Sequence, residues 1–254
     1  MSRKFEDWIK KYNIPNAPLI HIGAHLVQER DEYRKLNYSP VLWFEANPQI
    51  AEKARNILEN YPDQELLNKA LWSTAGVVKQ FYFAGHQGSS SSLLEPYLIS
   101  ASHPEVVKTG EISLVTSTLD AELNKLRSEV QYRVLVLDVQ GAEIEVILGG
   151  GNTLKIVDYI ISEISQIELY RNTSTVKELS KVLNEYGFTF VASEINRATG
   201  WGEGLFIKSS LLYDISDLDF DHQVIGKYLA KGRILRTILL ELKNIKARFQ
   251  RGNL

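Results

Sequence analysis

The sequence predicts an α/β protein in which helices cover both faces of a mostly parallel sheet. Short apolar strands alternate with helical segments along most of the chain, and this alternation is typical of a parallel sheet. The central stretch, residues 134–149, joins an unbroken apolar strand to a helix through a tight turn at Gly141. Strands of this kind are buried on both faces. The turn-rich residues 196–204 between two late strands predict a closing hairpin.

Length and composition limit the classes of protein that fit. The 254 residues suffice for one large domain, or for a domain with an appendage. No cysteine is present, which excludes disulfides, thiolate catalysis and thiolate metal ligands. The net charge of −2 gives no general affinity for polyanions, so we expect no nucleic-acid partner. No apolar run approaches the roughly 18 residues of a transmembrane segment, and no apolar signal core begins the chain, so we expect a cytoplasmic location.

The first half of the chain alternates strands with helices. The predicted strands are apolar runs bounded by turn residues: 19–22, 41–44, 66–71, 77–83 and 112–117. The predicted helices have an apolar side, a charged sequence or a capping residue at their start: 2–12, 28–36, 48–60 and 118–126. Pro48 stands at a first-turn position, where its missing N–H is harmless. Residues 112–117 alternate between apolar and polar, as an edge strand or a hairpin arm does.

A polar loop follows at residues 85–92 and contains four consecutive serines. By its position it would separate two parts of the same sheet. Loops longer than the usual few residues are often functional. We therefore interpret this serine loop, residues 85–92, as a loop over a binding site and not as a linker between domains.

The second half contains two strands that end in a carboxylate. One runs into Asp138, and the other ends at Glu163. In open α/β sheets, ligands bind beyond the carboxyl ends of the strands, so both acids are candidate site residues. Asp138 as a simple cap of the next helix is the structural alternative. The remaining elements are two strands on either side of the turn-rich segment and two helices: 188–192, 205–208, 143–148 and 175–186.

The last part of the chain is predicted to be a basic helical appendage. Apolar residues recur at helical spacing over residues 223–249. Four lysines and four arginines against one glutamate give residues 222–254 a charge of +7, which leaves −9 for the rest of the chain. We expect one domain over residues 1–210 and the appendage over 211–254. The helix would fold back on the acidic body or pack in a homodimer; peripheral contact with an anionic membrane is the alternative.

A second acid stands where a ribose would be held. Glu45 ends the second strand, 22 residues after the glycine turn at Gly23. A carboxylate about 20 residues past such a turn accepts both hydroxyl hydrogens of a ribose diol, and glycine lets the ligand approach the backbone. The turn is not a full G-x-G-x-x-G, so an ordinary strand–turn–helix unit stays an equal alternative.

Taken together, these segments resemble the FkbM family of S-adenosylmethionine-dependent methyltransferases over about residues 19–208. Three motifs carry most of the resemblance: IHIGA at residues 20–24, LWFEANP at 42–48 and VLDVQGAE at 136–143, around Asp138. The other matching segments are residues 68–71, the serine loop to Leu94, 161–164, 186–188 and 202–207. The resemblance implies a class I Rossmann-like methyltransferase fold with a seven-stranded sheet. It also implies S-adenosylmethionine as cofactor and O-methylation of a hydroxyl on a small-molecule or glycan acceptor, most often a sugar or a polyketide.

The resemblance also implies a cofactor site. Gly23 and Ala24 would line the methionine part, and Glu45 would hold the ribose hydroxyls. Asn47, Lys69 and Ala70 would border the adenine, and Ser91 or Ser92 would close over the cofactor. Asp138 would face the reacting centre, with Gln140 and Glu143 beside it. His25 and Ala46, which belong to the same turns, complete the predicted cofactor site.

Two residues depart from the family pattern. The family usually has an acid where this chain has His21, and a second glycine where it has Val27. The first difference affects the expected contact to the cofactor ammonium. The second suggests a different loop, to which Gln28 or Glu29 would contribute polar contacts.

A hydroxyl is a poor nucleophile until a base shares its proton, so the reaction needs a base as well as alignment. Asp138 is the first candidate, Glu163 the second and His86, in the serine loop, the third. Lone histidines such as His25 more often make local hydrogen bonds. No tight metal-ligand motif is present, so we expect no metal; a site built from Asp138, Glu163 and a histidine is the weaker alternative.

Three further interpretations stay open at the level of sequence. Trp201 and Tyr170 would flank a sugar ring, or would simply belong to the core. The altered first turn would also suit a non-catalytic relative that keeps the fold as a binding or assembly module. A nicotinamide-dependent oxidoreductase is disfavoured by the incomplete glycine pattern and by the segment around Asp138.

Overall fold

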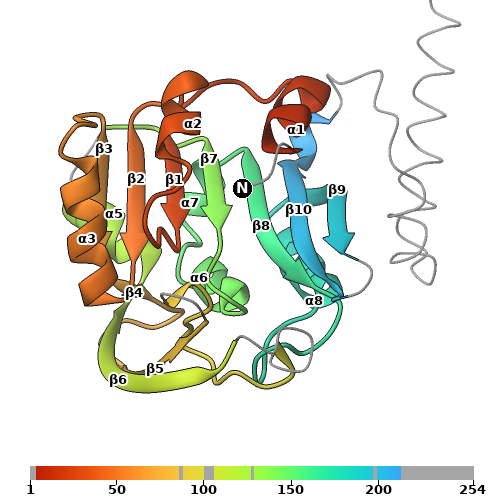
Figure 1. The fold of residues 1–254 in the computed structure, drawn as a ribbon. Helices are drawn as coiled ribbons and strands as arrows, with labels where there is room; N and C mark the ends of the chain where they lie inside the picture. Colours follow the sequence, from red (N-terminus) through yellow and green to blue (C-terminus); the bar gives the residue numbers. More distant parts are fainter. Residues whose placement is uncertain (1–3, 86–87, 100–105, 127–128, 197–198, 213–254) are drawn as a thin grey trace, which may run out of the picture. The chain divides into compact units, whose positions relative to one another are not determined.

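The central element is a seven-stranded, mostly parallel sheet (Figure 1). The computed structural model describes residues 4–85, 88–99, 106–126, 129–196 and 199–212. The strands lie in the order β3-β2-β1-β7-β8-β10-β9. Their bounds are β1 Leu19–Ile22, β2 Val41–Glu45, β3 Gln64–Asn68, β7 Val134–Leu137, β8 Tyr159–Ser165, β9 Phe188–Asn196 and β10 Trp201–Lys208. The five strands from β3 to β8 are parallel, and the β9–β10 hairpin is antiparallel, which confirms the predicted closing hairpin.

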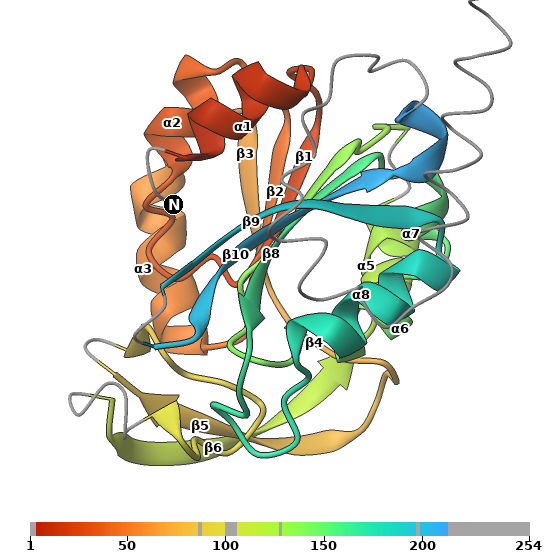
Figure 2. The ribbon, with the colours of Figure 1, turned by 90° about the vertical axis from the view of Figure 1, so that its right-hand side faces the viewer.

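Helices cover both faces of this sheet, as predicted. Figure 2 shows α1, α2 and α3 on one face and α5, α6, α7 and α8 on the other. Every residue of β1, β2 and β7 is buried, because both faces of these central strands are covered. The helices are α1 Lys4–Tyr12, α2 Arg30–Lys35, α3 Pro48–Leu58, α5 Leu119–Leu126, α6 Glu143–Leu148, α7 Thr153–Ile156 and α8 Val176–Glu185, followed by a 3₁₀ turn, η2, at Ser209–Leu211.

A second, three-stranded sheet corrects two predictions for the first half. The predicted strand over residues 66–71 is two strands, β3 and the short β4 (Ala70–Leu71). Between them the Lys69 N–H donates to the Glu45 carbonyl at 3.0 Å, and the chain then leaves the main sheet. β4 pairs with β6 (Lys108–Ser117), which forms a hairpin with β5 (Val78–Ala84). The serine loop therefore follows β5 of this second sheet and does not divide the main sheet.

The second sheet lies beyond the carboxyl ends of β1 and β2 (Figure 1), which places it beside the ligand-binding edge of the fold. The late hairpin is longer than predicted because polar residues continue the pairing, for example Glu203 opposite Glu194. The short helix α7 was not predicted. The predicted basic helix over 223–249 lies outside the described residues, and the boundary between domain and appendage stays a prediction.

Candidate active site

The first turn of the site depends on a glycine. Gly23 follows β1 with φ +94°, a conformation that favours glycine, and its N–H donates to the Phe44 carbonyl at 2.9 Å. A Cβ at this position would lie 1.7 Å from the carbonyl oxygen of Asp138. Only glycine therefore allows the turn after β1 to pack against the turn after β7. The strand order reverses between these two neighbours, and such a switch point is where α/β folds bind ligands.

The rest of this turn keeps an unusual backbone without a second glycine. His25 and Val27 have φ values of +43° and +49°, in the left-handed region that β-branched residues rarely adopt. Val27 is completely buried, so packing holds it there. His21, the other departure from the family pattern, is 4% exposed, stacks on Trp43 and shares a hydrogen bond of 3.0 Å between Nδ1 and the Tyr33 hydroxyl.

Glu45 is held with both carboxylate oxygens fixed at the end of β2. Its Oε2 accepts the His25 N–H at 2.8 Å, and its Oε1 accepts the Asn47 N–H at 2.7 Å. Burial raises the pKa of Glu45 above its ordinary value, against the lowering effect of these backbone N–H groups. Each oxygen still has lone-pair capacity for a ligand hydroxyl. The side chain thus suits a diol such as a ribose.

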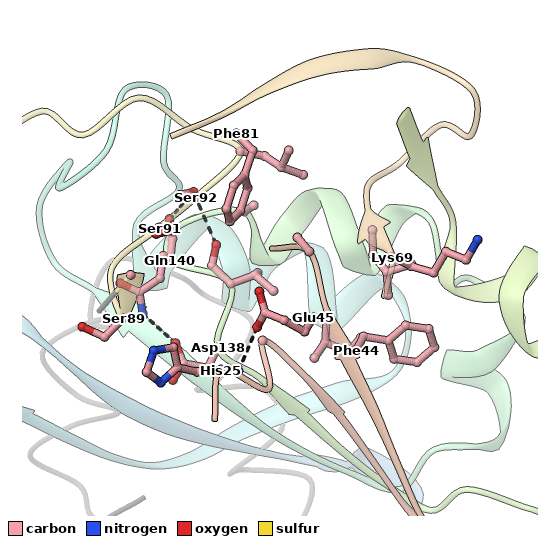
Figure 3. A pocket seen from close by; sticks show the side chains of 18 residues that line it. His25, Phe44, Glu45, Lys69, Phe81, Ser89, Ser91, Ser92, Asp138 and Gln140 are labelled. Atoms are coloured by element: carbon pink, nitrogen blue, oxygen red, sulfur yellow. Dashed lines mark hydrogen bonds between the residues drawn. The ribbon is translucent and has the colours of Figure 1, made fainter. Parts of the chain in front are cut away.

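A cavity lies over these turns (Figure 3). Its wall combines acidic and hydroxyl groups with apolar side chains, Phe44, Leu71 and Phe81 among them. We call it the cofactor pocket. Seven of the predicted cofactor residues line it: Gly23, His25, Glu45, Ala46, Lys69, Ser91 and Asp138.

Three other predicted cofactor residues lie beside the cofactor pocket and not in its wall. Ala24 is buried behind the turn. Ala70 is buried against Phe81 and partly buried side chains of the second sheet. The Asn47 side chain caps α3, where its Oδ1 accepts the Gln49 N–H at 3.1 Å, so Asn47 acts on the pocket through the N–H that it donates to Glu45.

The serine loop closes one side of the cofactor pocket, as the sequence predicts. Ser91 and Ser92 both line the pocket. The Ser92 hydroxyl donates to the Gln140 carbonyl at 2.8 Å and accepts the Leu94 N–H at 3.0 Å. The loop is therefore tied to the turn after β7. His86, the third candidate base, lies outside the described residues.

Gln140 joins the two candidate bases. It has φ +54° and is 7% exposed, and its side-chain amide donates to Asp138 Oδ1 at 2.6 Å and to Glu163 Oε2 at 2.9 Å. Figure 3 shows Asp138 and Gln140 together in the cofactor pocket. Burial, the neighbouring carboxylates Asp138 and Glu143 and a hydrogen bond to Asp138 raise the pKa of Glu163 well above its ordinary value. The protonated form of Glu163 is therefore favoured relative to that of an ordinary carboxyl group.

Glu143 stabilises the turn after β7 through hydrogen bonds to its backbone. Its Oε1 accepts the N–H groups of Val139 at 3.3 Å and Gly141 at 3.1 Å. Burial raises its pKa to about 7, and the charge of Asp138 acts in the same direction. A protonatable carboxyl thus fixes the backbone that carries Asp138 and Gln140.

Tyr170 belongs to the core, which is one of the two places considered for it from the sequence. Its side chain is 2% exposed, so the ring is not free to stack on a sugar. Its hydroxyl lies 2.8 Å from Gln140 Oε1 and 3.0 Å from the Ser90 carbonyl, and can donate to either. The contact joins segments 30 and 80 residues apart in the chain, which no local pattern could indicate. Trp201, by contrast, is partly exposed.

The reversed final hairpin, the seven-strand order and a pocket at the switch point define a class I Rossmann-like methyltransferase fold. The sequence model of the FkbM methyltransferase domain matches residues 21–190, two thirds of the chain. The chain therefore belongs to the FkbM methyltransferase family, whose cofactor is S-adenosylmethionine.

The individual proteins that resemble this chain share a quarter or less of its residues. The 2-O-methyltransferase NoeI of Sinorhizobium fredii is 25% identical over 179 residues, which cover 68% of this chain and 73% of NoeI. Among solved structures, the magnesium protoporphyrin IX methyltransferase of Synechocystis has a TM-score of 0.49 at 10% identity, with 82% of this chain and 77% of that chain covered. A SAM-dependent methyltransferase of Aquifex aeolicus has a TM-score of 0.45 at 9% identity, with 80% and 87% covered.

The residues of the cofactor pocket fit S-adenosylmethionine. Gly23 lines the pocket without a side chain, and Glu45 presents a fixed carboxylate for the ribose diol. The apolar walls at Phe44 and Phe81 suit the adenine face. Among the residues that the structure describes, no group of three or more His, Asp or Glu side chains could hold a metal ion, and no helix is long and apolar enough to cross a membrane.

Proposed function

We propose that this methyltransferase transfers a methyl group to a hydroxyl oxygen, and that its acceptor is a carbohydrate. The observation that carries the proposal is the position of Asp138, which lines the cofactor pocket and is joined to Glu163 through the Gln140 amide. The similarity to NoeI, a 2-O-methyltransferase, supports transfer to oxygen. The carbohydrate acceptor rests on the resemblance to the FkbM family.

Each residue has a limited part in such a reaction. S-adenosylmethionine, when bound, supplies an activated methyl group. Asp138 accepts the proton of the acceptor hydroxyl, and the Gln140 amide orients the Asp138 carboxylate by the hydrogen bond of 2.6 Å. Glu163 accepts the second hydrogen bond of the Gln140 amide, at 2.9 Å, and so helps to hold that amide in place against Asp138. The serine loop limits water access to the pocket.

The cofactor part of the proposal is tested by calorimetric titration with S-adenosylhomocysteine. Wild-type protein should bind it in the micromolar range. Glu45→Ala should weaken binding about 10- to 100-fold, since hydrogen bonds to a charged group contribute about 1.5–3 kcal/mol. Glu52→Gln, an exposed acid on α3, is the control. Unchanged affinity in Glu45→Ala would refute the ribose role of Glu45.

The catalytic part is tested with Asp138→Asn, which keeps the size of the side chain and removes the base. Turnover on a sugar acceptor should fall by about 10²- to 10⁴-fold, the usual contribution of general base catalysis. Affinity for S-adenosylhomocysteine should change little. Full turnover in this variant would exclude Asp138 as the base, and methyl transfer to a nitrogen acceptor alone would exclude O-methylation.

A further inference from the structure

A second cavity, of about 230 Å³, shares Asp138 with the cofactor pocket. We call it the acidic cavity. Asp138 lines both cavities, so a molecule in the acidic cavity would reach the proposed base, while Glu45 and the serine loop line only the cofactor pocket. The remaining lining residues come from β1, β7, β8, β10 and the loop before α2: His21, Glu29, Val136, Leu137, Ile161, Glu163, Trp201, Gly202 and Glu203.

Carboxyl groups make up most of the polar lining of the acidic cavity. Glu29, Asp138, Glu163 and Glu203 line it, and no lysine or arginine does so among the described residues. Glu203 stands directly opposite Glu163 in the antiparallel pairing of β10 with β8, so both side chains face the same side of the sheet. A ligand with negative charge would be repelled here, whereas hydroxyl and ammonium hydrogens would find acceptors.

His21 adds a neutral polar group to this wall. Its side chain is 4% exposed, and Nδ1 is used by Tyr33. The ring also lines the acidic cavity. Burial lowers the pKa of His21, so the imidazole is neutral at pH 7. An imidazole at a cavity wall can hydrogen-bond a ligand through its second ring nitrogen.

Trp201 supplies the apolar surface that the other lining residues lack. It lies two residues before Glu203 on the same face of β10, because side chains alternate along a strand. Its side chain also hydrogen-bonds Glu163, which fixes the indole. A fixed, partly exposed indole beside hydrogen-bond acceptors is a surface on which a sugar ring can pack with its C–H face.

We propose that the acidic cavity is the acceptor site, and that it selects sugars without negative charge near the reacting hydroxyl. Trp201 packs on the ring, while His21 and Glu203 bind its hydroxyl or amino groups. Asp138 faces the hydroxyl that reacts. This assignment rests on the proposed sugar O-methylation and adds to it the place of the acceptor and its charge class.

Three matched monosaccharides test the charge class by saturation-transfer NMR on the full chain with S-adenosylhomocysteine bound: methyl glucoside, methyl glucosaminide and methyl glucuronide. The first two should receive saturation, and the glucuronide should not. Trp201→Ala should weaken glucoside binding about fivefold, which corresponds to ~1 kcal/mol. Glu203→Lys should admit the glucuronide, and Glu203→Gln serves in its place if the lysine variant fails to fold. Glu52→Gln should behave as wild type.

Several results would overturn the assignment. The assignment fails if the glucuronide binds as well as the other two sugars, or if none of the three binds. It also fails if both Trp201→Ala and Glu203→Gln bind sugar as the wild type does. Titration of the same variants with S-adenosylhomocysteine separates the two proposals. If these variants lose cofactor affinity and keep sugar affinity, the acidic cavity belongs to the cofactor. If the wild-type protein does not bind S-adenosylhomocysteine at all, the proposed function fails, and sugar binding is judged on its own.

Discussion

Buried Glu143 makes the stability of the fold depend on pH. Its pKa is raised from 4.5 to about 7, and the side chain is 4% exposed, so solvent screens it little. The folded protein keeps a proton that the unfolded chain releases above about pH 4.5. The contribution of Glu143 is therefore fully present below pH 4.5 and is lost as the pH rises through about 7. A shift of this size corresponds to about 3 kcal/mol.

Glu143→Gln isolates this contribution. The glutamine oxygen can still accept the Val139 and Gly141 N–H groups, but the side chain no longer titrates. Urea unfolding of both proteins at several pH values gives the difference in free energy of unfolding. We expect this difference to move in favour of the variant by about 3 kcal/mol between pH 4.5 and pH 8.

The comparison cancels other titrating groups that are the same in both proteins. Glu52→Gln, an exposed acid changed in the same way, should give a difference that does not vary with pH. A constant difference between wild type and Glu143→Gln over the whole range would refute the reasoning, because it would mean that Glu143 is ionised in the folded state.

Three further substitutions test the backbone contacts of the site. Gly23→Ala should lower the melting temperature by about 4 °C or more and abolish cofactor binding, because its Cβ would meet the Asp138 carbonyl; normal affinity would show that the turn can move. Tyr170→Phe should cost about 1 kcal/mol, or about 2–4 °C in melting temperature, and an unchanged melting curve would mean that its two contacts contribute nothing. Ser92→Ala should speed proteolysis within residues 85–92, since the loop loses its bond to Gln140; an unchanged cleavage rate would contradict that anchor.

The sequence was sufficient for the main sheet because its strands are short apolar runs that end in recognisable turn or acidic residues. Gly23, Glu45 and Asp138 all stand at the predicted edge and line one pocket. The break at Lys69 could not be predicted, since residues 66–71 have one continuous strand-like pattern although they divide between two sheets. Pairing partners are a tertiary property that periodicity does not contain.

The site contacts that were missed are long-range contacts between side chains. Gln140 was expected only beside the reacting centre, yet it joins Asp138, Glu163 and Tyr170. Such a link depends on the left-handed backbone of Gln140, a residue type that rarely adopts it. The extension of the late hairpin was missed for a related reason, because its added residues are polar and pair through the backbone.

The division of the two cavities between different strands bears on how such an enzyme diverges. The cofactor wall is built from the ends of β1 and β2 and from the serine loop, whereas Trp201 and Glu203 belong to the β9–β10 hairpin at the other end of the sheet. Asp138 is common to both. Under the proposed assignment, mutations in the hairpin would exchange one acceptor for another without altering the cofactor wall, and we expect orthologues with different substrates to differ first at these hairpin positions.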